Sequence, residues 1–188
     1  NALSNPAMLR ILQTPIPTFR CPSDTAPNLN SDTQRKLNNI ETAVSNYVAS
    51  NNSFTPNLAA NISTGLFIPD VGRSFKDMSD GSSNVVCLGE RRWQIKNTYN
   101  NTNYITAAAN IYGVSRRPTT AAAPGGVLSV GASRINRSYL LTDANRANLG
   151  YSSQHTGGAN FSFADGSVRF ISDSVQGDFN AEGNNAGV

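Results

Sequence analysis

The stretch FSFADGSVRF, residues 161–170, places an Asp-Gly pair between two short runs in which apolar and polar residues alternate. Asp-Gly is a preferred pair for a two-residue hairpin turn, because both central positions of that turn need positive φ angles. The predicted register pairs Ala164 with Ser167, Phe163 with Val168, Ser162 with Arg169 and Phe161 with Phe170. Since strand side chains alternate, the three phenylalanines and Val168 would share one buried face.

His155 is the only histidine of the chain, and it precedes this hairpin by a tight turn through Gly157 and Gly158. Two interpretations stay open for its side chain: a hydrogen-bonded anchor of the turn, or a metal ligand or general base. The anchor is favoured, because one histidine, two distant cysteines and no H-E-x-x-H motif argue against a structural zinc site. Asp165 and Gly166 would lie at the far tip of the hairpin, away from His155.

The chain of 188 residues fits a single domain over residues 1–188. Charged residues make up only 14% of it, and the sequence pI is about 9.1. The basic residues are scattered rather than clustered, which disfavours nucleic acid as a partner. Short apolar runs separated by turns predict an α+β, β-rich fold with little helix, and no apolar run is long enough to span a bilayer.

Two segments illustrate how this fold class is reached. In residues 31–48, Leu37, Ile40, Val44 and Tyr47 recur at three- and four-residue steps, which predicts one apolar face of a helix. The second half, AVSNYVAS at residues 43–50, is equally compatible with a strand. A further strand is expected at residues 85–88, directly after the Asp80-Gly81 turn, and another within residues 126–133.

Candidate ligands outside the hairpin are sparse. Cys21 and Cys87 match no C-x-x-C spacing, so they form either one disulfide or two buried thiols. Asp77, Asp80 and Asn84 offer oxygen atoms to calcium but depart from the EF-hand order, so a plain turn is the better interpretation.

Enzyme chemistry has little support in the sequence. No G-x-S-x-G motif is present, and a hydrolase would depend on His155 and an arbitrary serine. Asp80, Glu90 and Asp165 are conceivable acid and base groups of a glycosidase. Trp93, Tyr99 and Tyr104 would instead suit a surface head that stacks on sugars.

Three blocks, FRCPSD at 19–24, SDGSSNVVCLGE at 79–90 and HTGGANFSFADGSVRFIS at 155–172, resemble a bacterial prepilin-like family of unknown function that carries a C-terminal H-x9-D-G signature. The resemblance implies an extracytoplasmic, cell-surface or secreted pseudopilin-like head with an antiparallel sheet. It also implies an N-terminal prepilin helix as the membrane anchor, which this sequence lacks.

The function expected from that resemblance is non-enzymatic: a structural or surface-assembly subunit of a filament or secretion system. Its partners would be copies of itself or other pilin-like subunits, and no cofactor is expected. The alternatives are a head that binds a surface glycan or calcium and, less favoured, a hydrolase using His155.

Overall fold

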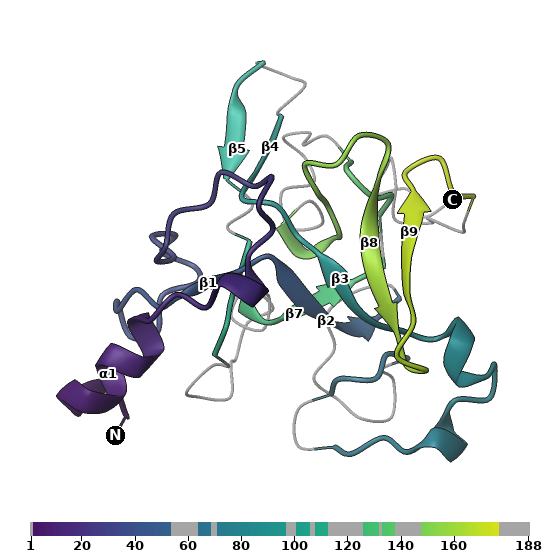
Figure 1. Cartoon of the computed structure of the whole chain (residues 1–188), viewed down its shortest axis with the longest axis horizontal. Coiled ribbons are helices and arrows are strands. Elements are labelled where there is room, and N and C mark those ends of the chain that lie inside the picture. Colours follow the sequence, from purple (N-terminus) through teal and green to yellow (C-terminus); the bar gives the residue numbers. More distant parts are fainter. Residues whose placement is uncertain are drawn as a thin grey trace, which may run out of the picture.

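The computed structural model is a β-rich molecule, and the residues it describes include the short α-helix α1 (Figure 1). The residues it describes are 2–53, 64–68, 71–96, 101–105, 108–112, 126–131, 133–137 and 148–176. The helices are η1 (Ala2–Ser4), α1 (Pro6–Gln13), η2 (Pro17–Phe19), η3 (Phe75–Asp77) and η4 (Ser82–Asn84). The strands are β1 (Val44–Ser45), β2 (Tyr47–Asn52), β3 (Val86–Glu90), β4 (Gln94–Lys96), β5 (Asn103–Ile105), β6 (Ala109–Asn110), β7 (Leu128–Val130), β8 (Gly158–Phe163) and β9 (Val168–Ser172).

The main sheet has five strands in the order β7-β2-β3-β8-β9, and β1-β6 and β4-β5 form two small antiparallel pairs. Within the main sheet the β2-β7 pair is parallel and the others are antiparallel. The predicted α+β, β-rich class with little helix is confirmed. The strands expected after the Asp80-Gly81 turn and within residues 126–133 are β3 and β7.

The hairpin of β8 and β9 forms around Asp165 as predicted, but the predicted register is wrong by one residue. The observed pairs are Ser162 with Val168, Phe161 with Arg169, Asn160 with Phe170, Ala159 with Ile171 and Gly158 with Ser172. The loop has three residues, since the Phe163 N–H donates to the Ser167 carbonyl and the Gly166 N–H donates to the Phe163 carbonyl. Gly166 has φ 84°, which fits a type I turn followed by a left-handed residue.

The one-residue shift changes which side chains face the core. Phe161 and Phe163 are buried, as expected, whereas Phe170 is 52% exposed and Val168 is 69% exposed. Arg169 lies opposite Phe161, at the position that the predicted register gave to Phe170. Its guanidinium lies 4.3 Å from the centroid of the Phe163 ring. Phe170 and Val168 are therefore surface residues of an edge strand, and the prediction of four apolar residues on one buried face was wrong for these two.

The helix predicted over residues 31–48 is absent, and its second half forms β1 and β2. Asn38 and Asn39 have φ angles of 50° and 64°, which a right-handed helix does not allow. Leu37 and Ile40 exchange two backbone hydrogen bonds across these asparagines. Two consecutive positive φ angles are the mark of a type I′ turn, a conformation that asparagine tolerates well.

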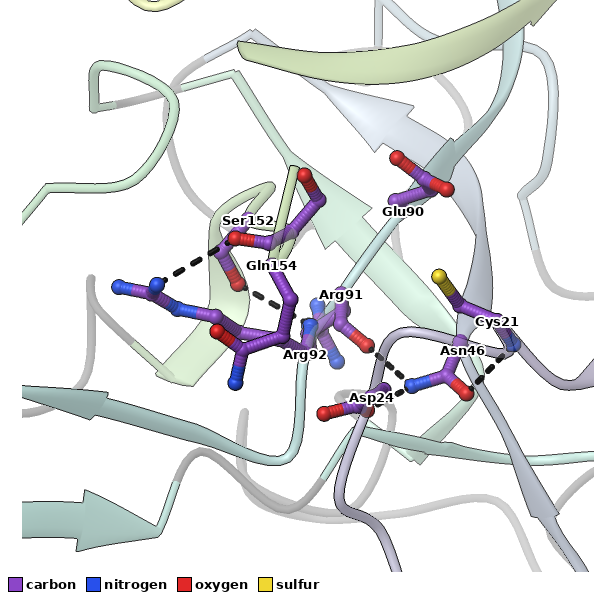
Figure 2. Close-up of a pocket in the computed structure, with 9 residues that line it drawn as sticks. Cys21, Asp24, Asn46, Glu90, Arg91, Arg92, Ser152 and Gln154 are labelled. Carbon is purple, nitrogen blue, oxygen red and sulfur yellow. Dashed lines mark hydrogen bonds between the residues drawn. The ribbon is translucent and has the colours of Figure 1, made fainter. Parts of the chain in front are cut away.

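Arg91 follows β3 and is fully buried beside Asn46 (Figure 2). Its guanidinium donates to four backbone carbonyl oxygens, those of Gly150, Ala108, Leu128 and Leu149. Burial lowers the pKa of Arg91, and the nearby positive charge of Arg35 lowers it further. The side chain thus joins segments that lie far apart in the sequence around the end of β3.

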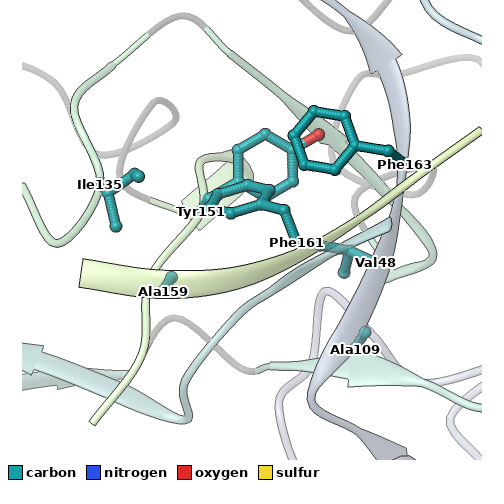
Figure 3. Packing of buried hydrophobic residues seen from close by; sticks show 7 residues of the cluster. All are labelled: Val48, Ala109, Ile135, Tyr151, Ala159, Phe161 and Phe163. Carbon is teal, nitrogen blue, oxygen red and sulfur yellow. The ribbon is translucent and has the colours of Figure 1, made fainter. Parts of the chain in front are cut away.

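The main apolar core lies against one face of β8 (Figure 3). It contains Val48, Ala109, Ile135, Tyr151, Ala159, Phe161 and Phe163. The rings of Tyr151 and Phe161 meet edge to face, with their centroids 4.9 Å apart. This aromatic pair fixes the middle of β8 against the segment that precedes the hairpin.

Helix α1 lies at the side of the molecule away from β9 (Figure 1). The Asn5 side chain caps its start by accepting hydrogen bonds from the backbone N–H groups of Ala7 and Met8. None of its residues is buried, and Met8 and Ile11 are about half exposed. In the part of the chain that the structure describes, no helix is both long and apolar enough to cross a membrane.

Candidate functional site

Three side chains from distant parts of the sequence converge at one point of the fold: Cys21, Glu90 and His155. The Nε2 atom of His155 lies 3.3 Å from Oε1 of Glu90 and 3.6 Å from Sγ of Cys21. One ligand-type atom from each residue lies within 4.8 Å of the other two. We call this group the Cys-Glu-His cluster; each of the three sequence blocks that carry the family resemblance contributes one of its residues.

Asn46, between β1 and β2, places Cys21 in the cluster (Figure 2). The Asn46 side chain accepts from the Cys21 N–H at 2.9 Å and donates to the Arg91 carbonyl at 3.1 Å. It also donates to the Asp24 carboxylate, which accepts from the Trp93 N–H. Because Asn46 is almost fully buried, this network fixes the Cys21 segment against the end of β3.

Glu90 ends β3 and points at the neighbouring strand β8. Its side chain is 3% exposed, and its Oε2 accepts a 2.7 Å hydrogen bond from the Asn160 N–H. A buried carboxylate is stable only where hydrogen-bond donors or positive charge replace water. The Asn160 side-chain amide lies 3.4 Å from each carboxylate oxygen, and Oε1 is also the oxygen that faces His155.

Within the turn before β8, the Ser153 hydroxyl accepts from the His155 N–H at 3.0 Å and donates to the Gly158 carbonyl at 2.7 Å. The hydrogen-bonded anchor predicted for His155 thus has Glu90 and Cys21, not the turn backbone, as side-chain partners. Gly157 supplies the positive φ of 79° that the turn needs. The imidazole faces Glu90 and Cys21, and 33% of the side chain is exposed.

Tyr47 lies beside the cluster, because it pairs with Glu90 across β2 and β3. Its pKa is raised above the ordinary value: burial is the largest cause, and electrostatic interactions with Glu90 and Cys21 add to it.

A surface cleft of about 450 Å³ opens beside Glu90 on the sheet face opposite the main core. Its walls are Thr18, Phe19, Tyr47, Leu88, Glu90, Asn160, Phe161, Ser162 and Val168. Phe19 and Val168 are exposed side chains at this cleft. Since Glu90 belongs to both features, the cleft and the Cys-Glu-His cluster are adjacent.

Cys21 and Cys87 are not joined by a disulfide in the structure. Cys21 is buried in the cluster, and Cys87 is a half-buried free thiol in β3. Burial raises the pKa of Cys87, and a hydrogen bond with Ser162 partly opposes that shift. Of the two thiols, Cys21 is the one that contacts a histidine.

The oxygen-rich segment of Asp77, Asp80 and Asn84 has the geometry of consecutive turns. Asp77 caps η3 by accepting from the Ser74 N–H at 2.7 Å, and hydrogen bonds from Ser74 lower its pKa. Asn84 donates its side-chain amide to the Asp80 carbonyl at 2.8 Å. These hydrogen bonds of Asp77 and Asn84 thus stay within the segment, in keeping with the interpretation of a plain turn.

Asp165 lies in the hairpin turn, as predicted, and serves that turn. The Ser167 hydroxyl and the Ser167 N–H both donate to its carboxylate, and these bonds lower its pKa.

Trp93, one of three residues considered for stacking on sugars, is buried and therefore cannot do so. Tyr104 lies in β5, and Tyr99 lies outside the described residues.

The geometry of the cluster separates two kinds of chemistry. In a nucleophilic triad, the cysteine and the orienting acid contact different nitrogens of the imidazole. Here the Cys21 sulfur and the Glu90 oxygen both approach Nε2. The arrangement is therefore one of convergence on a point, as in a metal centre, and not that of a proton relay.

The structure is thus a small β-rich α+β fold with a preformed polar cluster beside its central strand. The chain belongs to the family described as protein of unknown function DUF1559, whose model matches residues 2–178. No curated protein and no solved structure matches the chain.

Local sequence patterns missed the cluster, because its members lie in three separate segments. Glu90 was considered only as a glycosidase carboxylate, and Cys21 only as half of a disulfide. Asn46 and Asn160, which hold these side chains in place, have no local signature at all. The one available signal was that Cys21, Glu90 and His155 each fall in a block that carries the family resemblance.

Proposed function

We propose that this chain is the extracytoplasmic head of a pseudopilin-like, non-enzymatic surface-assembly subunit of a bacterium. Membership of the DUF1559 family supports the proposal, together with the resemblance of the blocks at 19–24, 79–90 and 155–172 to prepilin-like proteins with the H-x9-D-G signature. Its partners are copies of itself or other pilin-like subunits.

The observation that carries this proposal is helix α1. It buries no residue in the head, and its side chains Met8 and Ile11 are 47% and 51% exposed. Exposed apolar side chains on a helix are the kind of surface that a neighbouring subunit covers. A subunit that assembles through its N-terminal region leaves the sheet and its cleft on the outside.

A crosslinking experiment tests the proposal in the full-length gene product, produced in its own cells. A photo-crosslinking phenylalanine derivative at Ile11 is expected to join the protein, in the cell envelope fraction, to copies of itself or to pilin-like proteins. Phe75 is a matched control, because it is 76% exposed but distant in sequence from α1. Recovery of the protein in the cytosol, or equal crosslinking from both positions, would contradict the proposal.

A second function is favoured by the cleft beside Glu90: a head that binds a surface glycan. Phe19 and Tyr47 offer aromatic faces there, and Asn160 and Ser162 offer polar groups. A glycan array would identify a ligand, and Phe19→Ala should abolish its binding while Phe75→Ala leaves it unchanged. An array without any binding removes this function.

Two remaining possibilities have weaker support. Calcium binding would fall on Asp77 and Asp80, whose segment makes its hydrogen bonds locally, and a melting temperature unchanged by calcium would exclude it. A hydrolase using His155 would need the relay geometry that the Cys-Glu-His cluster lacks.

A further inference from the structure

The Cys-Glu-His cluster presents three different metal-ligand atoms to one point. Sulfur, imidazole nitrogen and carboxylate oxygen are the ligand types that zinc takes in proteins. Cys21 and Glu90 are buried, whereas a third of the His155 side chain is exposed. The cluster is thus built into the protein and yet open to solvent on one side.

The separations within the cluster fit a zinc coordination shell. Zinc bonds of ~2.0–2.1 Å to nitrogen, ~2.3 Å to sulfur and ~2.0–2.2 Å to oxygen, at tetrahedral angles, place nitrogen and oxygen ~3.4 Å apart and nitrogen and sulfur ~3.6 Å apart. The observed distances from His155 Nε2 are 3.3 Å to Glu90 Oε1 and 3.6 Å to Cys21 Sγ. Both distances from Nε2 match these values, and the Cys21 and Glu90 ligand atoms lie within 4.8 Å of each other.

Hydrogen bonding alone does not satisfy the three groups. Nε2 of His155 carries at most one proton, so as a donor it serves either the Glu90 carboxylate or the Cys21 sulfur. If Nε2 is unprotonated, it accepts from the Cys21 thiol but then faces the Glu90 carboxylate lone pair to lone pair. A cation bonds to all three atoms at once.

Contacts around the cluster hold its side chains in place for an ion. The Asn160 N–H donates to Oε2 of Glu90 at 2.7 Å, whereas Oε1 has only a longer, 3.4 Å contact with the Asn160 side-chain amide. Asn46 fixes the Cys21 backbone through the Cys21 N–H, and Ser153 fixes the backbone of His155. Supporting hydrogen bonds of this kind orient ligands and raise metal affinity.

We propose that Cys21, Glu90 and His155 form a zinc site with three protein ligands. The Cys21 thiolate, the Glu90 carboxylate and the neutral His155 imidazole bind one Zn²⁺, and a water molecule completes the tetrahedron. This site is independent of assembly through α1, and it shares Glu90 with the cleft.

Metal titration of the reduced, tag-free protein tests the proposal. We expect one Zn²⁺ per chain and a rise in melting temperature with zinc concentration, because an ion that binds only the folded state stabilises it. Co²⁺, used as a spectroscopic probe, should give tetrahedral d–d bands and a thiolate-to-cobalt charge-transfer band. The wild-type protein without zinc binding, or with cobalt spectra that lack the thiolate band, would overturn the proposal.

Matched variants assign the ligands. Cys21→Ser should remove the thiolate band, and Glu90→Gln and His155→Gln should each weaken zinc binding by ~100-fold or more, because even outer-shell changes weaken it ten- to a hundredfold. Cys87→Ser removes the other thiol and should leave the titration unchanged. Equal losses in Cys87→Ser and Cys21→Ser would refute the assignment, and the wild-type cobalt spectrum remains decisive if a variant fails to fold.

Discussion

The two phenylalanines that the observed hairpin register separates provide a direct test of the fold. Phe161 is 4% exposed and stacks on Tyr151, whereas Phe170 is 52% exposed. Phe161→Ala leaves a cavity and removes the edge-to-face pair, so it should lower the free energy of unfolding by ~3–5 kcal/mol. Phe170→Ala removes a half-exposed ring and should lower it by ~1 kcal/mol or less.

Urea denaturation followed by circular dichroism measures both values on the same scale. A protein of this size has a total stability of ~5–15 kcal/mol, so Phe161→Ala removes a large part of it. Phe161→Leu keeps most of the apolar volume and should lower stability by ~1–1.5 kcal/mol, which keeps the position measurable. Losses for Phe161→Ala and Phe170→Ala that agree within ~0.5 kcal/mol would refute the observed register and favour the one in which both rings share a face.

Three further predictions follow from contacts described above. Arg91→Met should lower the free energy of unfolding by ~4 kcal/mol, at ~1 kcal/mol for each of its four carbonyl hydrogen bonds. The control is Arg92→Met, at the half-buried neighbour, and a loss for Arg91→Met no larger than that of the control would contradict the prediction. Gly158→Ala should destabilise more than Gly157→Ala in thermal melts, since its Cβ would overlap the Ile171 carbonyl oxygen, while alanine at Gly157 meets open space and is strained only by the positive φ. Asp165→Asn should lower the urea midpoint at pH 7, and the difference from wild type should close as the pH falls below the ordinary carboxyl value of 3.8. The sign follows because a depressed pKa stabilises the fold only while the carboxylate is ionised; a difference independent of pH would contradict it.

Local patterns predicted several strands and the hairpin, but they gave the wrong hairpin register and a helix that does not form. The Asp165-Gly166 pair located the hairpin, but such a pair suits both a two-residue type I′ loop and a three-residue loop with a left-handed glycine. The choice between them moves every side chain of β9 to the other face. The apolar spacing of residues 31–48 indicated a helix, and the Asn38-Asn39 pair that prevents it was itself a turn signal.

Local sequence patterns could not predict the Cys-Glu-His cluster, because a different part of the fold brings each of its residues to the site. Glu90 comes to the site by the pairing of β3 with β8, and Cys21 by the buried Asn46 side chain. The histidine was recognised as chemically important, yet its partners depend on contacts across more than sixty intervening residues. Only strand order, which the sequence does not encode locally, brings them together.

The strand order also has a consequence for synthesis of the chain. β3 is the central strand of the main sheet, and it pairs on one side with β2 and on the other with β8. During translation from the N-terminus, one edge of β3 therefore stays unpaired until the last part of the chain emerges, and open edges invite association with other chains. Cys21 and Glu90 are present throughout this interval without His155, so a ribosome-released fragment lacking the hairpin would carry both an open sheet edge and an incomplete cluster.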